Sequence, residues 1–259
     1  MEDPVFETEN GVLKRYRGHD AVVSVPEGIT EIGGSFPLGR SYDENADRYY
    51  TRMAPGAFSG LDFIEEVRLP LSVTAVGPEA FRGCHALRKV TLPEGLLSVG
   101  EFAFAESALR FLAVPGRITE IPEGAFFSCT QLEEVVLPET LGSIGRRAFD
   151  NCLSLARLSL PRTLREIGPL AFSYCRSLTE LHLPGSVVRA GDQLCRGCSA
   201  LDDVSFPETV SVQKFCDSLW YVRYMERRGR CPACGAEIPS SVGQCVNPSC
   251  PTQYGKWER

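Results

Sequence analysis

Long apolar runs are missing from this sequence of 259 residues. No stretch approaches the roughly 20 consecutive apolar residues that a membrane-spanning helix needs. The N-terminal segment, MEDPVFETENGVLKRYRG, also lacks an apolar run of signal-peptide length. We therefore expect a cytoplasmic protein with no membrane partner. A leader upstream of Met1 would instead favour a place at the cell surface.

An excess of positive charge is also absent. The chain has 27 Lys and Arg against 33 Asp and Glu, a formal net charge of -6. This balance argues against whole-surface binding to nucleic acid or to an anionic membrane. Hydrophobic residues make up 43% of the chain and charged residues 23%, which is enough to build a continuous core and excludes wholesale disorder.

Catalytic motifs are missing too. The sequence contains no Walker A loop, no G-x-S-x-G and no H-E-x-x-H. Its three histidines are His19, His85 and His182, and none stands in a catalytic pattern. His182, near Glu180, is most simply an exposed polar side chain. We therefore expect a protein that is not an enzyme.

What the sequence does contain is a repeat with a constant period. An apolar residue followed by proline recurs at Leu69, Leu92, Val114, Leu137, Leu160, Leu183 and Phe206. A phenylalanine recurs with the same period at Phe58, Phe81, Phe104, Phe126, Phe149 and Phe172. In both series one step is a single residue shorter than all the others. Two independent markers with one period predict a solenoid of stacked units.

Each unit divides into a strand and a return. In residues 132–138, Val135 and Leu137 are two apart and share one face of a strand, and Pro138 ends the ladder because it has no N–H. Residues 147–152 fit one short helical turn, since Phe149 and Cys152 are three apart. The predicted fold is therefore a leucine-rich repeat solenoid of about seven or eight units. One parallel sheet would form one face, and short helical turns and loops the other.

This pattern resembles the BspA-type class of bacterial leucine-rich repeats. The resemblance rests on units such as residues 144–161 and 167–184, which follow the form IG..AF..C.SL..L.LP, and on the lead-in at residues 10–33. It covers about residues 10–210. The resemblance implies a binding solenoid, and members of the class are often secreted or located at the cell surface.

The cysteines fall into two groups. Five occupy one column of the repeat and are expected to be small, buried core residues rather than reactive thiols: Cys84, Cys129, Cys152, Cys175 and Cys198. Ser107 takes the column where the repeat is one residue short. Cys195 and Cys198 form a C-x-x-C, but Cys195 lies one full repeat after Phe172 and replaces the repeated phenylalanine. The repeat thus explains that pair without metal or redox chemistry.

The second group has the spacing of a metal site. Cys231, Cys234, Cys245 and Cys250 form C-x2-C and C-x4-C pairs separated by ten residues. Four thiolates close a tetrahedral zinc site and leave no open position, so one structural zinc ion is expected. Two disulfides, free thiols or a rubredoxin-like iron site are the alternatives. The segment resembles a zinc ribbon, and its C-x-N-P-x-C-P half is similar to the zinc finger of NAD-dependent DNA ligases; the resemblance implies metal ligation by these four residues.

Three segments do not follow the repeat. Residues 1–20 are expected to form an N-terminal cap on the solenoid, which spans residues 21–210. A loop is expected to be inserted into the solenoid at about residues 34–53, and it is either a neutral insertion or a functional one. Residues 211–229 have helical spacing at Phe215, Leu219, Val222 and Met225 and are predicted to be a capping helix and linker before the ribbon at 230–259. Arginines near its end form either a small basic patch or a solvated helix terminus.

The strand face is the predicted partner surface. Its exposed positions place an aromatic side chain among cations, which is typical of interaction sites. The candidate residues are Arg88, Lys89, Arg110, Phe111, Arg157 and His182. The leading hypothesis is a protein-interaction module that binds an unidentified protein. Nucleic-acid binding through the ribbon and the basic linker, and adhesion at the cell surface, are the alternatives. The oligomeric state stays open.

Overall fold

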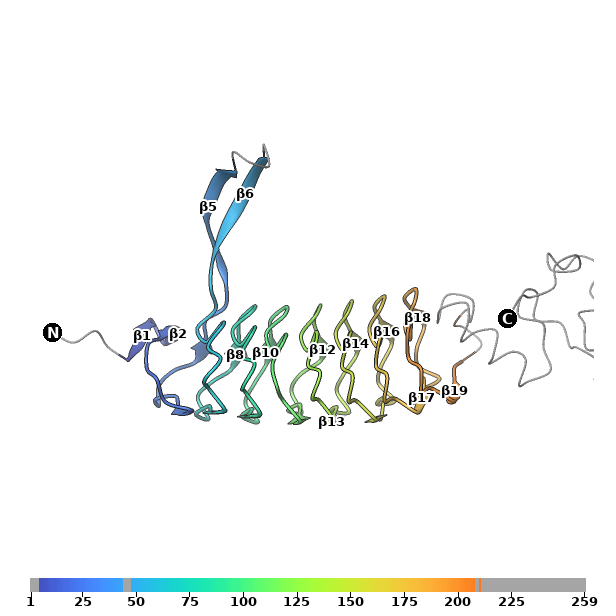
Figure 1. Cartoon of the computed structure of the whole chain (residues 1–259). Coiled ribbons are helices and arrows are strands. Elements are labelled where there is room, and N and C mark those ends of the chain that lie inside the picture. The colour runs from blue at the N-terminus through green and yellow to red at the C-terminus, as the bar shows by residue number, and fades with distance from the viewer. Residues whose placement is uncertain (1–4, 44–47, 208–209, 211–259) are drawn as a thin grey trace, which may run out of the picture.

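The structure is a computed structural model and describes residues 5–43, 48–207 and 210. The chain winds into a solenoid of about eight turns, about 23 residues apart (Figure 1). This confirms the repeat solenoid predicted from the sequence. Within the described residues there is no helix long and apolar enough to cross a membrane.

Row A is our name for the strands that precede each apolar-Pro pair. Its strands are two or three residues long and pair in parallel. Partners in neighbouring turns occupy the same position of the repeat, as Phe111 and Glu134 do. The row consists of β3 (Val22–Ser24), β7 (Glu66–Arg68), β9 (Lys89–Thr91), β11 (Phe111–Ala113), β13 (Glu134–Val136), β15 (Arg157–Leu158), β17 (Glu180–His182) and β19 (Asp203–Ser205). It is the parallel sheet predicted from the sequence.

Row B is a second set of parallel strands, and the prediction of only one sheet was wrong. Each strand has two residues, and its second residue, such as Ile144 or Ile167, is buried in most turns. A two-residue strand gives too short a pattern for periodicity to reveal. The row consists of β4 (Glu31–Ile32), β8 (Ala75–Val76), β10 (Ser98–Val99), β12 (Glu120–Ile121), β14 (Ser143–Ile144), β16 (Glu166–Ile167) and β18 (Arg189–Ala190).

The turn side is our name for the segments that carry the repeated phenylalanine, such as residues 145–152. The sequence predicted a short helical turn here, and that prediction was wrong: these segments are turns without a helix. Two residues of most of these turns lie in the left-handed region, for example Arg147 at φ 53° and Asn151 at φ 64°. In this segment every second N–H donates to a carbonyl of the next repeat, as Phe149 N does to Ala171 O at 2.8 Å.

The core runs the length of the solenoid as stacked columns. The six repeated phenylalanines are all buried, and neighbouring rings lie 4.9–5.8 Å apart with interplanar angles of 4–17°. A single repeat cannot bury its apolar face, whereas stacking buries phenylalanine on phenylalanine and leucine on leucine. The predicted phenylalanine column is thereby confirmed.

Two antiparallel hairpins flank the first turns. β1 (Phe6–Glu9) pairs with β2 (Val12–Tyr16), and β2 continues row B by pairing with β4. The insertion predicted as a loop at 34–53 is instead a hairpin of β5 (Phe36–Asp43) and β6 (Arg48–Ala54), which projects away from the solenoid (Figure 1). Its strands pair only with each other among the described strands, and backbone bonds such as Ser35 N to Pro78 O, 2.7 Å, anchor its base.

The predicted capping helix at 211–229 and the predicted ribbon at 230–259 lie outside the described residues, and the solenoid can be followed to Val210. The four predicted metal ligands, Cys231, Cys234, Cys245 and Cys250, belong to that part of the chain. The domain limits drawn from the sequence stay predictions.

Candidate interaction surface

The outward face of row A is formed by alternate residues of each strand. In β9, β11 and β13 the central residue is buried and its two neighbours are exposed. This is the period of two that a strand imposes, with Val90, Leu112 and Val135 in the core. Within each run of paired strands, β3-β7-β9, β11-β13-β15 and β17-β19, equivalent residues are in register, so the exposed side chains form columns across the run.

The six residues predicted from the sequence all lie on this face and are exposed: Arg88, Lys89, Arg110, Phe111, Arg157 and His182. Lys89 and Phe111 belong to consecutive strands of the stack, and Arg88 and Arg110 immediately precede those strands. Phe111 has 52% of its surface exposed. His182 lies further along, on β17. The structure therefore places five of the residues near the middle of the solenoid and the sixth towards its C-terminal end.

Two cations of the predicted basic cluster, Lys89 and Arg110, form ion pairs with glutamates of neighbouring repeats. Arg110 Nη2 lies 2.6 Å from Glu133 Oε1, and Lys89 Nζ lies 3.2 Å from Glu66 Oε1. Glu66 also accepts a bond of 2.9 Å from Arg68. The hydrogen bond from Arg68, and to a lesser degree that from Lys89, lowers the pKa of the Glu66 carboxyl. In the part of the chain that is described, Arg88 and Arg157 have no carboxylate within 4 Å.

Phe111 borders an open hollow of about 440 Å³ on this face. The hollow is lined by Arg110, Phe111, Glu133, Glu134, Ser154, Ala156 and Arg157. Its lining combines one aromatic ring, a carboxylate pair and two guanidinium groups. Val136 on the next strand is 47% exposed and extends the apolar surface in register with Ala113. An apolar centre with polar groups around it is the arrangement found at protein–protein interfaces.

The six residues predicted from the sequence did not include four that line the hollow, Glu133, Glu134, Ser154 and Ala156. A usable signal was present, because Arg110 and Glu133 occupy the same position in successive repeats and stacking brings their side chains together. The same relation holds between Glu66 and Lys89, which form an ion pair. Charge partners in a solenoid can thus be read by adding one repeat length to each residue number.

The cysteine column is buried, as predicted, and its thiols are free. Each Sγ lies 3.0–3.2 Å from a phenylalanine carbonyl one turn earlier, as in Cys152 with Phe126. Burial raises the pKa of Cys84 to about 12 and that of Cys129 to about 11. Cys195 is also buried, at the position of the repeated phenylalanine. The thiols of the column are neutral hydrogen-bond donors in the core.

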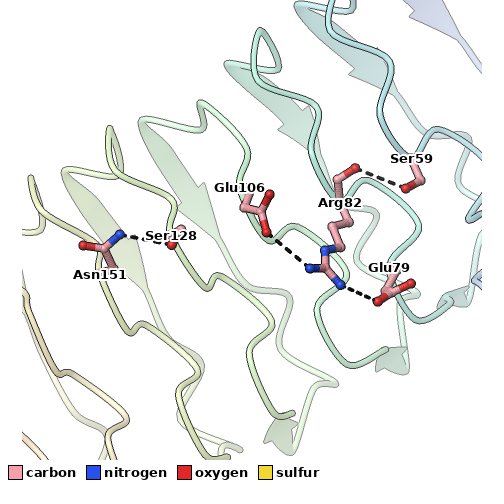
Figure 2. Close-up of polar contacts among 6 residues, drawn as sticks. All are labelled: Ser59, Glu79, Arg82, Glu106, Ser128 and Asn151. Atoms are coloured by element: carbon pink, nitrogen blue, oxygen red, sulfur yellow. Dashed lines mark hydrogen bonds and ion pairs between the residues drawn. The ribbon is translucent and has the colours of Figure 1, made fainter. Parts of the chain in front are cut away.

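Polar contacts on the turn side link one repeat to the next (Figure 2). Arg82 binds Glu79 at 2.6 Å and Glu106 at 3.4 Å, and Asn151 Nδ2 donates to Ser128 Oγ at 3.1 Å. Nearby, burial raises the pKa of Asp150, which accepts a hydrogen bond from Ser173 and pairs with Arg147. The contacts of Arg82 with Glu106, Asn151 with Ser128 and Ser173 with Asp150 link neighbouring turns, whereas the Arg82–Glu79 and Arg147–Asp150 pairs lie within one turn.

The chain belongs to the BspA-type leucine-rich repeat family, whose model matches six copies over residues 51–155 and 119–221. A solenoid of this class is a scaffold for interaction or adhesion, and leucine-rich repeat proteins generally bind proteins. The family is generally non-catalytic. Its pattern accounts for the phenylalanine, cysteine and apolar-Pro columns described above.

Several solved structures are similar to this chain. The leucine-rich repeat protein TpLRR of T. pallidum is 28% identical, with 76% of this chain and 75% of that chain covered and a TM-score of 0.49. A leucine-rich repeat protein of Bacteroides ovatus is 21% identical, with coverage of 82% and 64% and a TM-score of 0.47. A leucine-rich cell surface protein of Faecalibacterium prausnitzii is 17% identical, with coverage of 84% and 80% and a TM-score of 0.35. No curated protein matches the sequence.

Proposed function

We propose that the protein is a non-catalytic interaction module that binds a protein partner through the outward face of row A, centred on Phe111. The observation that carries this proposal is the half-exposed Phe111 ring beside the hollow of about 440 Å³. Exposed aromatic side chains that border a concavity are typical anchors at protein interfaces, where Trp, Tyr and Arg dominate the binding energy.

The charges around the hollow define the partner's chemistry. Arg157 and Arg88 have no ion pair in the described region, whereas Arg110 is held by Glu133. A segment that offers an apolar side chain to Phe111 and a carboxylate to Arg157 would complement this surface. Arginine suits that role because its planar fork binds a carboxylate through two hydrogen bonds.

Affinity capture from lysate followed by mass spectrometry, and then binding of the purified partner, tests the proposal. We expect Phe111→Ala or Arg157→Glu to weaken binding at least about tenfold. Leu97→Ala is the matched control, because Leu97 is 54% exposed but precedes a strand of row B. Equal affinity of Phe111→Ala, Arg157→Glu and Leu97→Ala would remove the row A face as the binding surface.

A variant without the β5–β6 hairpin separates the two candidate surfaces. Replacing residues 37–53 by a short turn leaves the row A face unaltered, because the hairpin strands pair only with each other among the described strands. Retained affinity supports the Phe111 surface. Loss of affinity would transfer the proposal to the hairpin.

The proposal includes one structural zinc ion held by Cys231, Cys234, Cys245 and Cys250, and a cytoplasmic location. The donor set supports zinc, because four thiolates satisfy its tetrahedral preference. Six free thiols in the described core accord with a reducing compartment. Cell fractionation tests the location, and recovery of the chain at the cell surface would favour adhesion. Salt-dependent binding to DNA or RNA that requires residues 211–259 would favour the nucleic-acid alternative.

A further inference from the structure

Three potential metal ligands meet at the C-terminal end of the row A face. His182 Nε2 lies 4.0 Å from Glu180 Oε2 and 3.8 Å from Asp203 Oδ2. The three ligand atoms all lie within 4.8 Å of one another. Register explains the meeting, because Glu180 and His182 lie two apart on β17 and Asp203 is the partner of Glu180 on β19. The side chains therefore extend from one rigid pair of strands.

Ser205 sets the direction of the imidazole ring. It is the partner of His182 across the strands, and its Oγ lies 2.9 Å from His182 Nδ1. When Nδ1–H donates to this hydroxyl, the lone pair of Nε2 faces the two carboxylates. A hydrogen bond to the second ring nitrogen is the usual way in which proteins fix a metal-binding histidine.

No fixed cation neutralises the two carboxylates. Among the described residues, neither Glu180 nor Asp203 has a lysine or arginine nitrogen within 4 Å. This differs from Glu66 and Glu133 on the same face, which are paired with lysine or arginine. In the tautomer whose Nδ1–H donates to Ser205, three acceptors converge without a donor, and a metal cation relieves their mutual repulsion.

We propose that Glu180, His182 and Asp203 bind one divalent transition-metal ion of the Zn²⁺ type. An imidazole nitrogen with two carboxylates favours such an ion over Mg²⁺ or Ca²⁺, which prefer oxygen ligands only. Metal–ligand bonds of about 2.0–2.2 Å in a tetrahedral site require ligand atoms about 3.5 Å apart. Exposed side-chain ends reach that separation by small rotations. The fourth position faces solvent and takes water or a ligand from outside the chain.

The test uses the full chain with its cysteine site first loaded with zinc and the excess removed. Zn²⁺ is then titrated while the ring signals of the three histidines are followed by NMR and heat by calorimetry. We expect one ring, that of His182, to shift in a saturable manner, with one further equivalent bound. His182→Asn abolishes this equivalent, and Glu180→Gln with Asp203→Asn weakens it at least about tenfold. Ser205→Ala weakens it less.

His85→Asn is the matched control, because His85 Nδ1 faces a single carboxylate, Asp62 Oδ1, at 2.7 Å. It should leave the additional binding unchanged. Equal zinc binding by wild type and His182→Asn would overturn the site. Unchanged affinity after loss of both carboxylates would overturn the three-ligand assignment, and an equal shift with Mg²⁺ would overturn the choice of ion. All variant positions are exposed, and an unchanged Tm confirms that they fold. The proposal is independent of the Phe111 surface.

Discussion

Each thiol of the cysteine column donates to a phenylalanine carbonyl that already accepts a backbone bond. Phe126 O, for example, accepts from Cys129 N and from Cys152 Sγ, both at 3.2 Å. A cysteine fits this place because it is small, largely apolar and still a weak donor. The hydroxyl of Ser107 fills the same column in the short repeat, where it lies 3.3 Å from Cys129 Sγ.

Buried thiols make the solenoid sensitive to alkali. The folded state raises the pKa of Cys84 to about 12 and that of Cys129 to about 11, from an ordinary value of 9.0. The unfolded chain therefore loses these protons first. The stabilisation is complete below pH 9 and is lost as pH rises from 9 towards the folded pKa, by about 1.4 kcal/mol per pH unit for each thiol.

The free energy of unfolding, measured in urea between pH 8 and 11, checks this prediction. Cys84→Ser should reduce the alkaline slope, because a serine hydroxyl does not ionise in this range. Lysine and tyrosine titration affects both proteins equally and cancels in the comparison. Parallel slopes for wild type and Cys84→Ser would contradict the assigned burial effect.

The six repeated phenylalanines are among the largest fully buried side chains of the described residues, so truncating one should be costly. Phe126 stacks between Phe104 at 5.7 Å and Phe149 at 5.3 Å, whereas Phe172 stacks on one phenylalanine, Phe149, at 5.8 Å. Phe126→Ala should reduce the free energy of unfolding by about 3–5 kcal/mol. Phe172→Ala should cost less, because it has one stacked ring and the next turn carries Cys195. Urea denaturation measures both, and an equal cost would argue against stacking as the cause.

At the scale of elements, the turn side shows why part of the fold could not be read from the sequence. Phe149 and Cys152 are three apart and both buried, which fits a helical turn as well as the observed pair of β-turns. The deciding feature is positive φ at Arg147 and Asn151, and only asparagine of these two is a residue that favours it. Row A was predictable because buried and exposed residues alternate along its strands and a proline follows each of them. Row B was not, because a strand of two residues is too short to show an alternation.

The inserted hairpin was unpredictable for a related reason. Its strands pair Tyr42 with Tyr49 and Asp43 with Arg48, but a bulge between Pro37 and Gly39 breaks the alternation. On the candidate surface, the period of two placed Lys89, Phe111, Arg157 and His182 outward, whereas Arg88 and Arg110 are exposed positions immediately before their strands. The hollow, the Arg110–Glu133 pair and the Glu180–His182–Asp203 cluster required the register between neighbouring strands, which the sequence carries only as a spacing of one repeat.

Leu170 tests the role of the left-handed turns. Its φ is 60°, a conformation that costs a side chain with a Cβ about 1–2 kcal/mol. Leu170→Gly removes this cost but adds chain entropy to the unfolded state, so we expect a net stabilisation of about 0.5 kcal/mol. Leu170→Val should destabilise, because a β-branched residue tolerates positive φ poorly. Thermal and urea unfolding measure both, and destabilisation by glycine would contradict strain at this position.

At the scale of the whole molecule, each turn is stabilised chiefly by its neighbours. Both strand rows are interrupted at one shared place, between β9 and β11 in row A and between β10 and β12 in row B, and row A is interrupted again between β15 and β17. At the shared place the apolar-Pro and phenylalanine markers stand one residue closer together than in the other repeats. A missing residue shifts one turn against the next, yet Phe104 and Phe126 still stack across the step. The core columns thus continue where the strand pairing stops.

The two C-x-x-C pairs of the chain provide a test of the zinc proposal with an internal control. Cys195 and Cys198 are buried in the solenoid, and Cys198 Sγ donates to Phe172 O at 3.0 Å. Cys231 and Cys234 belong to the proposed ribbon. We expect purified protein to contain one tightly held zinc ion. Cys231→Ser with Cys234→Ser should remove that ion, and Cys195→Ser with Cys198→Ser should retain it.

Chelation should then act on one part of the molecule only. A segment as short as 230–259 has too little core to fold without metal, so zinc removal should expose it to proteases. The solenoid carries its own core and should keep its urea midpoint. Elemental analysis and limited proteolysis, before and after a strong chelator, measure both effects. Zinc-free native protein would exclude the ribbon, and zinc lost from the Cys195 and Cys198 variant would assign the metal to the solenoid instead.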